Sequence, residues 1–93
     1  MNSSKFEAKA SKLTFEKETM SVHLIDGRIL IVPLAYFPRL AKAKASERKK
    51  YIISGGGEGL HWDSIDEDIS VPLLLQGFVD KNSRLKHPDL LAG

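Results

Sequence analysis

The dipeptide Asp26-Gly27 constrains the fold of this chain more than any other feature, because it separates two strand-like runs. In a type I′ β-hairpin turn both central residues adopt positive φ, which Asp and Gly accept more readily than most residues. Apolar and polar residues alternate along the preceding run, 20–25, as in a strand with one buried face. The sequence therefore predicts an antiparallel hairpin of strands 20–25 and 28–34.

The run 28–34 is almost wholly apolar, which predicts a central strand that is covered on both faces. Its pairing is expected to end at Pro33, because proline has no N–H to donate to a neighbouring strand. A further strand is predicted over 10–15, where Leu13 and Phe15 share a face.

The second half of the chain predicts short helices and short strands. Pro38 suits the first turn of a helix over 39–45, and Ser46 is predicted to cap a second helix over 47–53. Ser70 is predicted to cap a last helix, 71–76, that ends at Gly77. The segments between them are predicted to be a glycine-rich loop at 55–59, a strand at 60–62, a turn at 63–66 and an extended piece at 68–70.

These elements and the length of 93 residues predict one α+β domain over 10–77, with a small, mostly antiparallel sheet and two to three short helices. Residues 1–9 are predicted to be a flexible start, and 78–93 a loosely ordered C-terminal tail. We expect a cytoplasmic protein, because no apolar run is long enough for a membrane span or typical of a signal peptide. The chain has no cysteine, which excludes disulfides and a cysteine nucleophile.

Two segments of opposite charge follow each other in the chain. Residues 39–50 hold six basic residues and one acid, whereas residues 58–68 hold five acids and no Lys or Arg. Such asymmetry indicates either a nucleic-acid-binding face or two segments that attract each other, within the fold or across a dimer interface. If nucleic acid is bound, the expected phosphate contacts are Arg39, Lys42, Lys49 and Lys50.

No motif for catalysis, a metal or a cofactor is complete. The glycine run 55–59 lacks the Lys-Ser or Lys-Thr that follows a phosphate-binding loop, and it is predicted to follow a helix rather than a strand. His61 and the aspartates after it suggest an acid–base or metal cluster, but carboxylates this dense in a turn more often accept hydrogen bonds from backbone N–H groups. We therefore predict no catalytic, metal-binding or cofactor-binding residue, and we expect Asp66 to be a structural carboxylate.

Two stretches of the chain, taken together, resemble a known family. The matching residues are Asp26-Gly27-Arg28, Pro33-Leu34, Phe37-Pro38-Arg39-Leu40, Ala43, Arg48, Tyr51, Gly57 to Trp62, Asp66 to Ser70, and Leu74-Leu75. In order and spacing they are similar, over residues 10–77, to the small bacterial family catalogued as domain of unknown function 2442. The resemblance implies a small α+β domain without an assigned activity. It also implies that relatives occur alone, fused to a helix-turn-helix domain, or encoded beside another small protein in toxin–antitoxin-like arrangements.

The shared residues are interpreted as a structural set. Trp62 is predicted to close the core against Leu40 and Tyr51, and an arginine of the helical half is predicted to meet an aspartate of the final turn. The candidate interaction residues are Arg39, Arg48, His61, Trp62, Asp66 and Asp68.

The function predicted from these features is that of a non-catalytic interaction module, an antitoxin-like or regulatory partner of another small protein. Its leucine-bearing tail is predicted to dock on that protein, and a homodimer is a second candidate assembly. The alternative is a nucleic-acid-binding or transcription-regulatory domain that uses the basic segment 39–50. A third hypothesis, a small hydrolase, requires His61 and Asp66 to converge in an open pocket.

Overall fold

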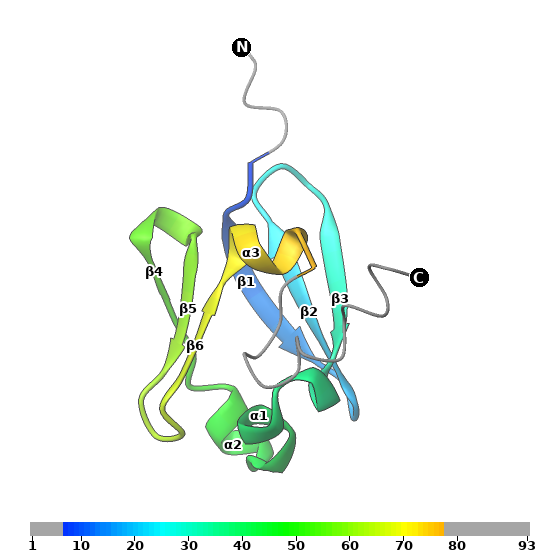
Figure 1. Cartoon of the computed structure of the whole chain (residues 1–93), viewed down its shortest axis with the longest axis vertical. Helices are drawn as coiled ribbons and strands as arrows, with labels where there is room; N and C mark the ends of the chain where they lie inside the picture. Colours follow the sequence, from blue (N-terminus) through cyan, green and yellow to red (C-terminus); the bar gives the residue numbers. More distant parts are fainter. Residues whose placement is uncertain (1–6, 78–93) are drawn as a thin grey trace.

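The computed structural model describes residues 7–77, whose strands form two antiparallel sheets of three strands each (Figure 1). The first sheet has the order β1 (Ala10–Phe15), β2 (Thr19–Leu24), β3 (Ile29–Pro33), and the second has the order β4 (Ile52–Ser54), β5 (Gly59–Trp62), β6 (Glu67–Ser70). The predicted α+β class and the antiparallel pairing are confirmed. The predicted tail 78–93 lies outside the described residues, as does most of the predicted flexible start, 1–9.

The β2–β3 hairpin forms where Asp26-Gly27 predicts it, with a longer loop than expected. Leu24 N–H donates to the Arg28 carbonyl, 2.8 Å away, so residues 25–27 form the loop. Gly27 has φ 98°, whereas the φ of Asp26 is not positive. A loop of this length is typically a type I turn followed by a left-handed residue, which explains why only the glycine needs positive φ.

Strand β3 is an edge strand, so the prediction of a central strand covered on both faces is wrong. Ile29 and Ile31 are 55% and 63% exposed, whereas Val32 is buried. The pairing with β2 does end at Pro33, opposite Thr19, as proline requires. An uninterrupted apolar run does not distinguish a strand buried on both faces from an edge strand that exposes one apolar face.

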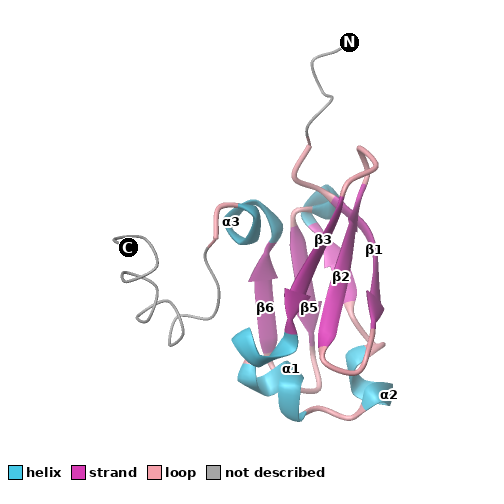
Figure 2. Cartoon of the chain, turned by 90° about the vertical axis from the view of Figure 1, so that its right-hand side faces the viewer, coloured by secondary structure: helices cyan, strands magenta, loops and turns pink. Residues whose placement is uncertain are grey.

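The helices are short and partly displaced from their predicted positions. Their bounds are η2 (Leu34–Tyr36), α1 (Pro38–Lys42), α2 (Ala45–Arg48), η3 (Gly55–Gly57) and α3 (Val71–Leu75). Pro38 begins α1, and the Ser70 hydroxyl accepts a hydrogen bond from Leu73 N–H, 3.3 Å away, so both of these predictions are confirmed. Figures 1 and 2 place α1 and α2 at one end of the two sheets and α3 at the other.

The second predicted helix, 47–53 with Ser46 as its cap, is wrong at both ends. Lys44 is the residue that precedes α2, and its backbone N–H donates to the Glu47 carboxylate, 3.2 Å away. A glutamate that reaches back three residues marks a helix start at this position rather than at Ser46. The two β-branched residues at 52–53, which were predicted to end the helix, belong instead to strand β4 and pair with β5.

One hydrophobic core joins both sheets and the helices. Its fully buried side chains come from β2, the helical segment, β5 and α3: Met20, Val22, Phe37, Leu40, Leu60, Trp62 and Val71. Tyr51 packs against this core, and its ring lies 6.4 Å from that of Phe15 on β1. Within residues 7–77, no helix is long and apolar enough to cross a membrane.

Candidate functional site

His61 lies on the outer face of the second sheet, and both of its ring nitrogens contact carboxylates. Nδ1 is 2.6 Å from Asp68 Oδ1, and Nε2 is 2.5 Å from Asp63 Oδ1. The sheet register explains the first contact, because His61 on β5 is directly opposite Asp68 on β6. Asp63 follows two residues later and therefore shares the face of His61, whereas Trp62 between them is buried in the core.

This arrangement favours a charged imidazole. The hydrogen bond to Asp68, followed by the one to Asp63, raises the pKa of His61 above its ordinary value of 6.5, because both carboxylates stabilise the protonated ring. A protonated imidazole donates from both nitrogens, so neither nitrogen remains to accept a proton from a substrate. Asp66 does not contact the ring, so the structure does not bring together the pair on which the hydrolase hypothesis depends. Among residues 7–77, no group of three or more acidic or histidine side chains is arranged to hold a metal ion.

The raised pKa of His61 predicts that stability falls as the pH rises. A group whose pKa is higher in the folded state than in the unfolded state contributes its full stability below the unfolded value, here 6.5. That contribution is lost as the pH rises through the higher folded-state pKa. Urea unfolding on both sides of pH 6.5 should therefore show that the free energy of unfolding of the wild type declines as the pH rises. The decline should be smaller for His61→Gln. The matched control is His23→Gln, because the His23 ring contacts the Thr14 hydroxyl rather than a carboxylate; an equal effect of both variants would contradict the assignment.

Arg39 joins α1 to the second sheet through a different acid from the one predicted. Its Nη1 donates to the backbone carbonyl of Asp66, 3.0 Å away, and lies 3.7 Å from Oε1 of Glu67. The Glu67 side chain is only 5% exposed, whereas Asp66 is exposed and has a left-handed backbone, with φ 53°. The buried acid is thus Glu67, rather than Asp66 or Asp68. The alternation of β6 could have identified it, because Glu67 lies on the same face as the buried Ile69.

Arg48 and Trp62 have structural roles. The Arg48 side chain donates from Nε to the carbonyl of Leu40, 2.8 Å away, and from Nη2 to the carbonyl of Ala41, 2.9 Å away. Both carbonyls belong to the last turn of α1, so Arg48 folds back on the preceding helix. The Trp62 indole N–H donates to the backbone carbonyl of Arg48, 2.9 Å away, and so fixes the position of α2 against β5.

The exposed lysines of the helical end do not form one continuous stripe. Lys42 ends α1, whereas Lys49 and Lys50 follow α2, and a break at 43–44 separates the two helices. A shallow groove of about 220 Å³ lies beside α1, but it is lined by none of these lysines. Its lining residues are Lys17, Glu18, Pro33, Leu34, Ala35, Ala41 and Arg48. The basic segment thus forms two separate helices, as predicted, but the break lies at 43–44 rather than at Ser46.

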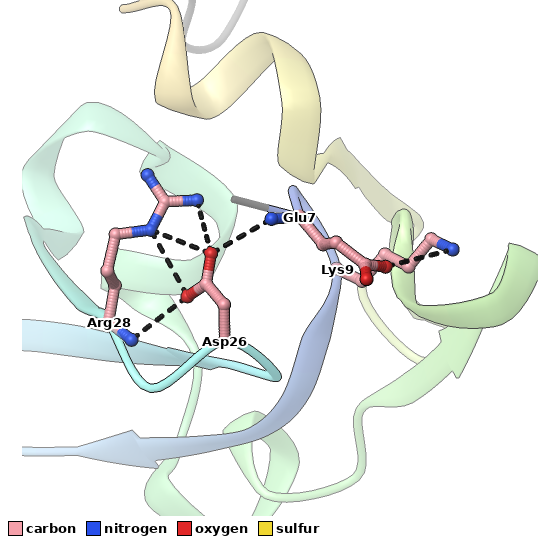
Figure 3. A network of polar contacts seen from close by, with 4 residues as sticks. All are labelled: Glu7, Lys9, Asp26 and Arg28. Atoms are coloured by element: carbon pink, nitrogen blue, oxygen red, sulfur yellow. Dashed lines mark hydrogen bonds and ion pairs between the residues drawn. The ribbon is translucent and has the colours of Figure 1, made fainter. Parts of the chain in front are cut away.

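A second polar cluster holds the β2–β3 turn against residue 7 (Figure 3). The Asp26 carboxylate accepts hydrogen bonds from the Arg28 backbone N–H and Nε and from the Glu7 backbone N–H, at 2.9–3.1 Å. Arg28 Nη2 lies 2.8 Å from the same carboxylate. The Arg28 side chain, followed by these backbone N–H groups, lowers the pKa of Asp26 to about 2.

The lowered pKa of Asp26 predicts a loss of stability in acid. A carboxyl group with a depressed folded-state pKa stabilises the fold above its ordinary value, here 3.8, and this contribution is lost as the pH falls through about 2. Asp26→Asn should therefore destabilise the protein at neutral pH, and its unfolding midpoint in urea should approach that of the wild type as the pH is lowered. A difference between the two proteins that is independent of pH would show that the charge of Asp26 is not the stabilising element.

A comparison with models of protein families places the chain in a family. The model of a protein family of unknown function, DUF2442, matches residues 10–80. A crystal structure of a protein of unknown function from Rhodospirillum rubrum is similar, with 28% sequence identity and a TM-score of 0.69 over 78% of this chain and 90% of that chain. The comparison with curated proteins found no match. Since the family model spans both sheets and all three α-helices, the chain belongs to the DUF2442 family.

Proposed function

We propose that this protein is a non-catalytic, cytosolic interaction module that binds a basic segment of another small protein on the outer face of its second sheet. The observation that carries the proposal is the position of His61, held between Asp63 and Asp68 with both ring nitrogens occupied. Such an arrangement fixes a pattern of charge on the surface and leaves neither nitrogen of this imidazole free to act as a base. It therefore supports recognition more than reaction.

The chemistry of this surface defines its partner. The side chains of Asp63 and Asp68 are 79% and 75% exposed, and each contacts His61 through Oδ1 only. Their remaining oxygens are acceptors for an arginine or lysine of the partner, and charge-assisted hydrogen bonds of this kind are stronger than neutral ones. Ile52 on β4 lies opposite His61, is 47% exposed, and offers an apolar contact at the edge of the charged group. A partner segment with a basic residue beside an apolar one fits this surface.

The partner is proposed to be the other member of a two-protein regulatory pair, as in the toxin–antitoxin-like arrangements that the family resemblance implies. The alternative, nucleic-acid binding by Lys42, Lys49 and Lys50, would use the helical end of the molecule instead. The two hypotheses assign binding to different surfaces and are therefore separable by mutation.

The proposal is tested by affinity capture from the native host, followed by calorimetry with the purified partner. The double variant Asp63→Asn/Asp68→Asn should lose the partner, while Asp66→Asn should retain it. Asp66 is the matched control, because it is an exposed aspartate of the same turn that does not contact His61. Nucleic acid that is released as salt rises, and that is lost on alanine substitution of Lys42, Lys49 and Lys50, would instead establish the alternative.

A further inference from the structure

We propose that two copies of this chain pair through the free edges of their β3 strands, so that their first sheets join into one continuous antiparallel sheet. This surface is separate from the outer face of the second sheet and does not depend on the function proposed above. The partner is thus a second copy of the chain, and the recognition chemistry is that of backbone pairing.

The hydrogen-bond pattern of the β2–β3 pair shows which groups of β3 face outward. Leu24 N–H donates to the Arg28 carbonyl, and Leu34 N–H donates to the Glu18 carbonyl. Bonded pairs alternate along an antiparallel ladder, so every second residue of β3 from Arg28 onward directs its N–H and carbonyl toward β2. Ile29 and Ile31 lie between those residues, and their backbone groups therefore point to the free edge.

Among residues 7–77, this edge is the least protected of those in the two sheets. Strand β3 carries no charged residue, and charged side chains are one of the devices that keep edge strands apart. The opposite edge of the same sheet is blocked, because the Tyr51 hydroxyl accepts from Leu13 N–H at 3.2 Å and β1 has an irregular register between Ala10 and Lys12. Strand β6 presents Asp68, and β4 has only three residues.

One register of the β3–β3 pair satisfies every outward donor. With a two-fold axis beside Leu30, Ile29 pairs with the partner's Ile31 and exchanges both backbone hydrogen bonds with it. A register centred on Ile31 would instead place Pro33, which has no N–H, in a hydrogen-bonded position. The axis beside Leu30 also gathers the exposed isoleucines of both copies on one face of the joined sheet.

The distribution of charge permits this approach. Arg28, the charged residue next to β3, is paired with Asp26 of its own chain at 2.8 Å. Antiparallel pairing about Leu30 places Arg28 opposite the partner's Val32, so no like charges face each other. Because only five residues of each chain take part, the interface is smaller than that of a stable obligate dimer. The dimer is therefore expected to dissociate on dilution.

The oligomeric state tests this proposal directly. Sedimentation equilibrium over a range of concentrations should show a monomer–dimer equilibrium for the full chain. Ile31→Lys should raise the dissociation constant of the dimer by about tenfold or more, because it introduces a charge on the strand edge. Ile52→Lys is the matched control, because it places the same charge at an exposed isoleucine of the second sheet and should leave the dimer intact. A protein that remains monomeric at every concentration, or equal loss in both variants, would overturn the proposal.

Variants with a single introduced cysteine test the register, because the natural chain has no cysteine that could compete. In the proposed register Leu30 faces the partner's Leu30 as a non-hydrogen-bonded pair, with Cα atoms about 4.5 Å apart, a separation that suits a disulfide. Leu30→Cys should therefore form a disulfide-linked dimer on mild oxidation, and faster than Ile31→Cys. Faster linkage through Ile31→Cys would indicate that the isoleucine faces stack on each other, and would overturn pairing through the strand edge. Neither result depends on the binding of a basic partner, whose loss on substitution of Asp63 and Asp68 is measured separately.

Discussion

Replacement of Gly57 by alanine is expected to destabilise the protein by about 2–4 kcal/mol, because the backbone at this position is both left-handed and in close contact with β1. Gly57 has φ 109° and is buried in η3, the β4–β5 connection, next to the beginning of β1. A Cβ at this position would lie 2.8 Å from the Lys9 Cβ, 3.0 Å from the carbonyl oxygen of Ala10 and 3.1 Å from the Ala10 nitrogen. These neighbours belong to or adjoin the backbone, so they have little freedom to move aside.

Gly55→Ala separates the two contributions. Gly55 lies in the same connection and also has positive φ, 59°, but a Cβ there would meet no atom within 4 Å. It should therefore cost only about 1–2 kcal/mol, the cost of a left-handed alanine. Urea unfolding of both variants, monitored by circular dichroism, measures the difference between their free energies of unfolding. If Gly57→Ala is no more destabilised than Gly55→Ala, the two sheets do not approach each other at this glycine.

The parts of the fold that depend on local sequence were predictable. The β2–β3 hairpin, the end of pairing at Pro33 and the cap at Ser70 each follow from the backbone chemistry of one or two residues. The loop of the hairpin was predicted one residue too short, since the sequence does not show that Leu24, rather than Ile25, is the last residue to pair. Local chemistry thus located the turn but did not determine its type.

The errors concern elements whose state is decided by distant neighbours. Nothing in the apolar run of β3 indicates whether another strand lies beside it, and the sheet order makes it an edge. Likewise, residues 52–53 are compatible with the end of a helix until β5 offers them a pairing edge. Tertiary pairing overrides local propensity at such ambiguous positions.

The sequence identified residues of the candidate site but did not predict the contact between His61 and Asp68. His61 and Asp68 were identified as motif residues, but their pairing depends on the β5–β6 register, which a prediction that started β6 at Asp68 could not supply. The start of β6 one residue earlier also explains why Glu67 is the buried acid beside Arg39. A register is a relation between two segments, so the composition of either one does not determine it.

Trp62→Ala is expected to cost about 3–5 kcal/mol, because it removes the largest of the fully buried side chains. A small domain has a total stability of about 5–15 kcal/mol, so this variant should be near the limit of folding at room temperature. Trp62→Phe keeps most of the apolar volume and removes the indole N–H that donates to the Arg48 carbonyl at 2.9 Å. The loss expected for this variant is about 1–3 kcal/mol.

Urea unfolding measured by far-ultraviolet circular dichroism tests these values, since the chain has a single tryptophan and both variants remove its fluorescence. Leu73→Ala is the control, because Leu73 is 47% exposed and its truncation should cost less than about 1 kcal/mol. A similarly small effect of Trp62→Ala would contradict its place in the core.

Trp62→Phe also distinguishes a structural residue from a recognition residue. Trp62 points away from the face that carries His61, so the folded variant should bind a partner of that face with unchanged affinity. Asp63→Asn/Asp68→Asn should lose that affinity, and its loss of stability should be confined to the pH-dependent contribution of His61.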